Sequence, residues 1–442
     1  MFKNYLLLSL KVLKRKPFYT FISLFGISFT LMILMLLTSL FDAMLGDNQP
    51  LTHRDRIIIA PSLERTRTEV DTIMTIDTVA LTDGGMRYDT AYTYEEEVVS
   101  NSNGPMSWKF VDGQLRDFEY AANYAFYNDN GHIDGYLDGR KFSFAPYYTT
   151  ASYWDVFDFK FLEGGRFLPE DEAQASKVAV VTDKAAREYF GTDDATVIGR
   201  EMNLGGELYT VRGIVARPYS DSPMFGGDVY LPVTTIDQRS LDSEEVYGGF
   251  SAVFLTEKPE HRRLLQEEIN FLADNYQLPP DSYYDAVEVF NATFLEGYAQ
   301  GILQERDPNR AVRLMFIPII ILVMLFVALP LLNLVNLNIG RVHERKAEIG
   351  VRKAFGANGR DILWQFIFEN LVLTVIGGTV GLLLALALIN YVNANDLLGI
   401  TRLSYSPDVF VYFLLVILAF GFLSGILPAY RMSRTSVANS LR

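Results

Sequence analysis

The sequence contains no cysteine and only four histidines among its 442 residues. The absence of cysteine excludes disulfide frameworks, thiolate metal sites and cysteine nucleophiles. No two histidines share a metal-ligand spacing such as HExxH, and the Gly-x-Ser-x-Gly elbow of serine hydrolases is missing. We therefore expect a protein that is not an enzyme, with no catalytic residues, no metal site and no cofactor of its own.

Basic residues are outnumbered two to one by acidic residues in the middle of the chain. Residues 42–310 carry 23 Lys and Arg against 47 Asp and Glu, a net charge of −24, whereas the rest of the chain carries 16 basic and 6 acidic residues. Phosphate backbones are bound by clustered Lys and Arg, so the acidic block argues against nucleic acid as a partner. The two regions differ enough in composition to indicate at least two different environments for one chain.

Four long stretches have almost no charge. A membrane-spanning helix needs about 20 mostly apolar residues, and the candidates are residues 18–40, 314–335, 366–392 and 409–427. The first is too long for the apolar core of a signal peptide, which runs about 7–15 residues, and no small-residue cleavage site follows it. We therefore expect four membrane helices, the first of them uncleaved.

The short flanking segments predict the orientation. Residues 1–17 carry five basic residues and no acid, and residues 341–362 carry six basic residues and three acids, whereas 393–408 carries one basic residue. Basic residues stay in the cytoplasm. Both termini are then cytoplasmic and residues 41–310 lie outside. Residues 1–17 read as a basic amphipathic helix on the inner membrane surface.

The outer block alternates strand-like and helical patterns. The runs 56–60, 178–182, 209–215, 228–231 and 252–255 are typical of strands, and 184–190 and 260–275 have helical spacing. Such alternation indicates an α+β or α/β layer structure. The expected fold is thus an α-helical membrane protein with four transmembrane helices and a large α+β extracytoplasmic domain inserted between the first and second.

Three features of the outer block invite a chemical interpretation. The segment 128–139 is rich in oxygen ligands but does not match a calcium loop, and its Asn-Gly and Asp-Gly pairs favour hairpin turns. Residues 95–97 are three glutamates, which we interpret as a solvated charged run. The outer block also contains a run of aromatic residues, which either packs in the core or forms a surface that binds a partner or substrate. It includes Tyr147, Tyr148, Tyr153 and Trp154.

The charged segment 341–360 separates two of the expected membrane helices. Its sequence predicts a helix that begins near Arg341 and ends at Gly356, with Glu344, Glu348 and Arg352 spaced as i,i+4 neighbours. A charged helix tethered at both ends to membrane helices can transmit force from a cytoplasmic partner. The alternative is a passive basic loop that only sets the topology, and the residues alone favour neither interpretation.

This segment closely resembles the signature of MacB/FtsX-type ABC-transporter permeases. The pattern reads roughly E-R-x-x-E-I-G-x-R-K-A-x-G-A, followed by I-x-x-Q-F-x-x-E. The matching residues are Glu344, Arg345, Glu348, Ile349, Gly350, Arg352, Lys353, Ala354, Gly356, Ala357, Ile362, Gln365, Phe366 and Glu369. The glycines at 377, 378 and 381 and the ending Leu427-Pro-Ala-Tyr-Arg431 are similar to the same family.

The outer block is similar to the MacB-type periplasmic core domain. The similar segments are 156–167, 178–182, 185–191, 198–200 and 209–215. The resemblance covers nearly the whole chain and implies a core domain over 41–310, with an inserted subdomain near 150–235. An FtsX-like permease domain then covers 311–442.

The resemblance implies a bacterial inner-membrane permease subunit with its large domain in the periplasm. It places contact with an ATPase on Glu344, Arg345, Glu348, Gly350, Arg352, Lys353 and Gly356. No Gly-x-x-x-x-Gly-Lys-Ser/Thr motif occurs in the sequence, so ATP would be bound by a separate ABC ATPase subunit.

The resemblance also implies mechanotransmission and a second permease chain, identical or different. Gly377 with Gly381 and Gly421 with Gly425 would allow close helix approach, either between the chains or within one chain. Export or efflux, with a periplasmic adaptor or outer-membrane channel as a further partner, is one expected role. The alternative is a non-transport regulator of a cell-wall hydrolase or of lipoprotein trafficking. The substrate stays open.

Overall fold

A computed structural model gives the structure of the chain. It describes residues 17–46, 48–80, 86–129, 131–218, 222–344, 351, 359–395, 397–398, 403–404, 407–408, 410–412, 415, 418–419 and 422. The chain divides into two compact units. Unit 1 comprises residues 1–46 and 313–442, and unit 2 comprises residues 47–312.

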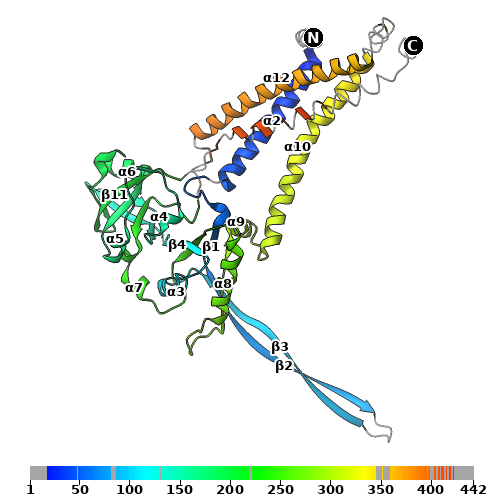
Figure 1. Cartoon of the computed structure of the whole chain (residues 1–442). Helices are drawn as coiled ribbons and strands as arrows, with labels where there is room; N and C mark the ends of the chain where they lie inside the picture. The colour runs from blue at the N-terminus through cyan, green and yellow to red at the C-terminus, as the bar shows by residue number, and fades with distance from the viewer. Residues whose placement is uncertain are drawn as a thin grey trace. The chain divides into compact units, whose positions relative to one another are not determined.

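Unit 1 is built from long apolar helices (Figure 1). They are α2 (Pro17–Leu45), the larger part of α10 (Pro308–Glu344) and α12 (Gly359–Ala394). Within the described residues, three stretches are long and apolar enough to cross a membrane: Thr20–Ala43, Pro308–Phe326 and Ile367–Ala394. These agree with the first three expected spans. The fourth, 409–427, lies mostly outside the described residues, so the count of four stays a prediction.

The expected helix start near Arg341 is wrong. Helix α10 runs without a break from Pro308 to Glu344, so Arg341 lies inside it. After Pro330 this helix contains no further proline, the residue that lacks a backbone N–H donor and breaks helices. The sequence therefore gives no reason for a break before Arg341. The charged segment therefore begins as the end of a membrane helix. Its expected end at Gly356 lies outside the described residues.

Unit 2 contains one large mixed sheet (Figure 1). In its described part the sheet has twelve strands in the order β15-β1-β13-β4-β7-β12-β9-β11-β10-β5-β6, with β8 paired to β11. The strands are β1 Ile57–Ala60, β4 Ala121–Asn128, β5 Ile133–Leu137, β6 Arg140–Phe144, β7 Pro146–Thr149, β8 Phe161–Gly164, β9 Val178–Thr182, β10 Glu201–Leu204, β11 Glu207–Val215, β12 Val229–Pro232, β13 Ser251–Thr256 and β15 Ala292–Thr293.

Seven helices accompany this sheet in the described part of unit 2. They are α3 Trp108–Gln114, α4 Tyr153–Val156, α5 Pro169–Ala173, α6 Asp183–Phe190, α7 Gln238–Asp242, α8 His261–Asn275 and α9 Phe294–Leu303. Parallel pairs such as β9 with β11 occur beside antiparallel ones such as β1 with β13. The expected α+β class is confirmed, as are the five expected strands and the two helices α6 and α8.

Separate hydrophobic clusters fill the two ends and the middle of the sheet. One gathers under β1, β13 and β4 with α3 and α8, and another around α6 with β9, β10 and β11. The cluster around α6 also includes Phe144, with Ile133 and Phe142 packed against it. Strands from before and after residue 150 belong to the same sheet. The sheet therefore marks no boundary there, and the inserted subdomain at 150–235 stays a prediction.

A long two-stranded ribbon extends from a second, small sheet (Figure 1). Its strands are β2 (Leu63–Ala80) and β3 (Met86–Gly104), and β14 (Ala286–Val289) pairs only with the first residues of β2. The sequence analysis did not predict this ribbon. The expected charged run lies on β3, where Glu95 and Glu97 are exposed as expected.

The segment 128–139 forms part of a hairpin. Strands β5 and β6 are joined at Asp138 and Gly139, whose φ angles are 49° and 75°. Two consecutive residues with positive φ are typical of a tight type I′ turn, which favours Asp-Gly. The hairpin interpretation of this segment is confirmed.

Candidate functional site

Most of the expected ATPase contact lies outside the described residues. This holds for Arg345, Glu348, Gly350, Arg352, Lys353 and Gly356, while Glu344 is the last residue of α10. The helices on either side are described, and they end and begin at Glu344 and Gly359. We call residues 345–358, which join the two helices in the sequence, the connection; of these the structure describes only Val351.

Gly377 and Gly381 let α12 lie directly against α2. A Cβ atom on Gly377 would stand 2.8 Å from Ile27 Cγ2, and one on Gly381 would stand 2.7 Å from the backbone oxygen of Ser28. A Cβ carbon essentially never lies this close to a non-bonded atom, so glycine is the residue that permits this approach. The structure supports the intrachain interpretation for this pair. Gly421 and Gly425 lie outside the described residues.

A buried polar pair lies on α12, a few residues beyond the charged connection. Gln365 Nε2 donates to Glu369 Oε1 at 3.1 Å, and the Glu369 side chain is 2% exposed. Polar and ionisable residues within membrane helices face the bundle interior and are usually functional. The sequence analysis quoted both residues in the family pattern but did not include them among its candidate residues.

The aromatic run of unit 2 belongs mainly to the core. Tyr153 is fully buried and its hydroxyl donates to the Met224 carbonyl at 2.9 Å, while Tyr147 and Trp154 are also buried. Burial raises the pKa of the Tyr153 hydroxyl well above its usual range. A partner surface formed by these three residues is therefore wrong, because neighbouring rings already cover them. Tyr148 is half-buried on β7.

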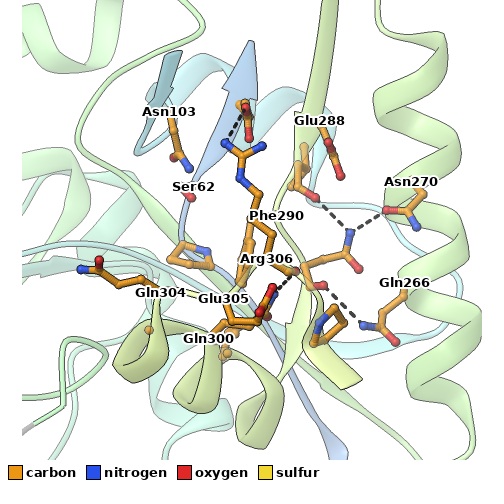
Figure 2. Close-up of a pocket in the computed structure, with 18 of the residues that line it drawn as sticks. Ser62, Asn103, Gln266, Asn270, Glu288, Phe290, Gln300, Gln304, Glu305 and Arg306 are labelled. Carbon is orange, nitrogen blue, oxygen red and sulfur yellow. Dashed lines mark hydrogen bonds and ion pairs between the residues drawn. The ribbon is translucent and has the colours of Figure 1, made fainter. Parts of the chain in front are cut away.

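Unit 2 contains a cavity of about 820 Å³ (Figure 2). It lies where the ribbon joins the body of unit 2, between β14, α8 and the end of α9. Seven side-chain amides line it: Asn101, Asn103, Gln266, Asn270, Asn291, Gln300 and Gln304. Figure 2 shows Gln266 and Asn270 projecting from α8 on one side and Asn103 on the other, with Phe290 between them.

The cavity was not predictable from local patterns. Its polar side chains come from the two ribbon strands, α8, the residues after β14, and α9 with the turn that follows it. No motif joins these segments in the sequence. These segments come together only in the folded chain, where β14 pairs with β2 and brings Glu288 opposite Glu64.

The base of the ribbon is fixed by arginine stacking. The Arg65 guanidinium carbon lies 3.7 Å from the centre of the Tyr247 ring and 4.5 Å from that of Tyr284. The Arg67 guanidinium carbon lies 4.4 Å from the Tyr283 ring centre. Cation–π contacts each contribute about 0.5–1 kcal/mol at exposed sites. The ribbon is thus anchored at one end, beside the cavity.

Comparison with known proteins assigns both parts of the chain. The model of the MacB-like periplasmic core domain matches residues 20–270, which is more than half of the chain, and that of the FtsX-like permease C-terminal matches residues 315–437. The chain belongs to the MacB/FtsX family of ABC-transporter permeases. The resemblance carried by the charged segment and the outer block is therefore confirmed.

Individual relatives of this MacB/FtsX-type permease are distant. It is 32% identical over 227 residues to the macrolide export ATP-binding/permease protein MacB of Bdellovibrio bacteriovorus, covering 50% of this chain and 32% of that protein. It is 25% identical over 294 residues to the ABC transporter permease YvrN of Bacillus subtilis, covering 66% and 68%. The pyoverdine export ATP-binding/permease protein PvdT of Pseudomonas entomophila is 26% identical over 293 residues, covering 65% and 41%.

The chain thus spans about a third to two fifths of the two relatives named ATP-binding/permease proteins. Among solved structures, a permease domain from Porphyromonas gingivalis aligns over 55% of this chain and 91% of its own, with 14% identity and a TM-score of 0.38. The periplasmic region of MacB from Actinobacillus actinomycetemcomitans aligns over 46% and 86%, with 15% identity and a TM-score of 0.34.

Proposed function

We propose that this chain is the permease subunit of a bacterial inner-membrane ABC transporter that works by mechanotransmission in export. A separate cytoplasmic ATPase hydrolyses ATP, and the permease passes the resulting movement to its periplasmic domain. Both termini lie in the cytoplasm, and a second permease chain, identical or different, completes the membrane part. The relatives named as macrolide and pyoverdine exporters favour export over a purely regulatory role.

The assignment of ATP to a separate subunit rests on the sequence. The 442 residues contain no phosphate-binding loop of the Gly-x-x-x-x-Gly-Lys-Ser/Thr type.

The proposal rests mainly on the charged connection between α10 and α12. This connection holds five charges within nine residues, from Arg345 to Lys353, too many for lipid. Helix α12 packs closely on α2 through Gly377 and Gly381. A push on the connection would therefore move α12 and α2 together, because closely packed helices shift as one body.

Charge reversal in the connection tests the proposal. Glu348→Lys, or Arg352→Glu with Lys353→Glu, should leave membrane level and folding unchanged, since exposed ion pairs contribute only about 0–1 kcal/mol. At an interface, loss of one desolvated charge of a pair removes about 2–5 kcal/mol of binding. We expect loss of ATPase co-purification or of export-coupled hydrolysis.

The matched control is Arg239→Glu with Lys258→Glu, two exposed positions in unit 2. This control should co-purify with the ATPase as the unchanged protein does. Normal association and normal coupled hydrolysis in the Arg352/Lys353 double variant, at matched expression, would reduce the connection to a topological anchor and refute the proposal.

A further inference from the structure

We propose that the cavity at the base of the ribbon binds an uncharged oligosaccharide. This inference does not depend on ATP coupling, because it rests on the lining of a cavity within unit 2. Ligand pockets are usually lined by apolar and aromatic side chains with a few polar groups. Here seven of the lining residues carry side-chain amides (Figure 2), so the fitting ligand presents many hydrogen-bonding groups beside an apolar face.

Four carboxylates and two arginines line the cavity, and Glu305, one of the carboxylates, pairs with Arg310 outside the lining. Arg306 lies 3.7 Å from Glu64, and Arg263 lies 3.5 Å from Glu267. Each arginine of the lining thus has a carboxylate beside it, which leaves neither of them unpaired to attract a phosphate or carboxylate ligand. The lining carboxylate of Glu288 has no ion pair within the described residues and can accept hydrogen bonds from hydroxyl groups.

The amides are held in place, yet much of their hydrogen-bonding capacity is unused. Asn291 Nδ2 donates to Asn270 Oδ1 at 2.7 Å, and Gln300 Nε2 donates to the Arg306 backbone oxygen at 2.7 Å. Each amide has two donor hydrogens and one acceptor oxygen, so Asn270 keeps both donors and Gln300 keeps its acceptor. These bonds orient the amides toward a ligand before it arrives.

One acceptor points to a missing donor. Gln300 Oε1 is buried and has no hydrogen-bond partner among the described residues. Buried polar atoms are almost always paired, so this oxygen lacks the donor that such an atom normally has. Gln304 and Asn103, which are exposed at the cavity, also make no side-chain hydrogen bond in the described part of the chain. Donors and acceptors therefore remain free on several sides of the cavity.

Saccharides match this pattern better than peptides. Each hydroxyl donates and accepts at once, as each amide does, and the half-buried Phe290 ring offers one apolar face for the C–H side of a sugar. An extended peptide is recognised by a strand edge together with pockets for alternate side chains. Val289, an apolar residue of the lining, is 1% exposed and already packed in the core.

Binding can be measured with the full chain in lipid nanodiscs by saturation-transfer NMR and calorimetry. The probes are chitotriose, which represents N-acetylated cell-wall glycan, and maltotriose, which represents plain sugars. Trialanine and a sialylated trisaccharide serve as the peptide and anionic comparisons. We expect at least one neutral trisaccharide to bind, and Asn270→Leu and Gln300→Leu to weaken that binding about tenfold each.

Gln304→Asn should not weaken folding, because the side chain is exposed and forms no hydrogen bond in the described structure, and asparagine suits the left-handed backbone at this position (φ 51°). It should weaken binding several-fold. Gln238→Leu removes an amide from α7, outside the cavity, and should leave the affinity unchanged. The proposal fails if neither neutral trisaccharide binds, if trialanine or the sialylated sugar binds more tightly, or if the three cavity variants bind as the unchanged chain does.

Discussion

Gly381 of α12 lies against Leu31 of α2 so closely that a Cβ atom on the glycine would stand 2.9 Å from the leucine Cβ. The same Cβ would stand 2.7 Å from the Ser28 backbone oxygen. A backbone atom cannot move aside as a flexible side chain can. This contact therefore shows how closely α2 and α12 are packed, and the first prediction tests it.

Gly381→Ala should loosen the α2–α12 contact. In an open helix the change to alanine is favourable by about 1 kcal/mol, but overpacking in a close contact costs about 1–3 kcal/mol. We expect lower thermal stability of the membrane helices, measured by a melting curve in detergent. Gly301→Ala is the control, because nothing lies within 4 Å of a Cβ at that position of α9. A Gly381 variant as stable as the Gly301 variant would contradict the packing.

The ribbon places acids opposite acids. Glu69 pairs with Glu97, and Asp71 with Glu95, in the register of β2 and β3. Like charges directly opposite are destabilising, and opposite charges contribute about 0.2–1 kcal/mol per pair. Glu95→Lys with Glu97→Lys should slow hydrogen exchange of the ribbon amides at low salt, and less so at high salt.

The control for the ribbon is Thr93→Lys, which adds a positive charge opposite Ile73 on the same strand. It should change ribbon exchange much less than the double variant does. Faster exchange in the double variant would mean that β2 and β3 do not pair in this register.

Tyr148 gives a pH prediction. Burial raises the pKa of its hydroxyl to about 12, above the usual value of about 10. Between these values the unfolded chain loses the proton while the folded chain keeps it, so stability falls as pH rises from about 10 to about 12. Tyr148→Phe should lessen this loss, seen as an alkaline unfolding midpoint at higher pH. An unchanged midpoint would argue against the burial of the hydroxyl.

The sequence predicted the elements in which buried side chains recur at a regular spacing. Val178–Thr182 and the following helix were found because apolar runs and helical spacing reflect burial, and the Asp138-Gly139 turn because its backbone requires those residues. The ribbon was missed because Val70, Met74, Tyr92 and Tyr94 are all exposed and leave no signal of a core. The cavity was missed because its amides converge only through tertiary contacts.

The last prediction concerns Glu369, which is buried on α12 and accepts a hydrogen bond from Gln365. Glu369→Leu removes the acceptor to which the buried Gln365 Nε2 donates, and loss of a buried hydrogen-bond partner costs about 1–3 kcal/mol. If Glu369 serves only packing, Glu369→Leu should therefore lower the melting temperature but leave the coupled movement intact. If Glu369 takes part in coupling, the same variant should hydrolyse ATP with its partner subunit but lose the coupled movement of the outer domain.

That movement can be followed as a nucleotide-dependent change in proteolysis of residues 47–312. Trp364→Leu is the matched control, since this neighbouring side chain on α12 is 56% exposed and faces away from the buried pair. We expect the Trp364 variant to keep the nucleotide-dependent change and the Glu369 variant to lose it, with Glu369→Gln intermediate because an amide can still bond to Gln365. Full retention of the change in Glu369→Leu at normal membrane level would assign the pair to packing alone.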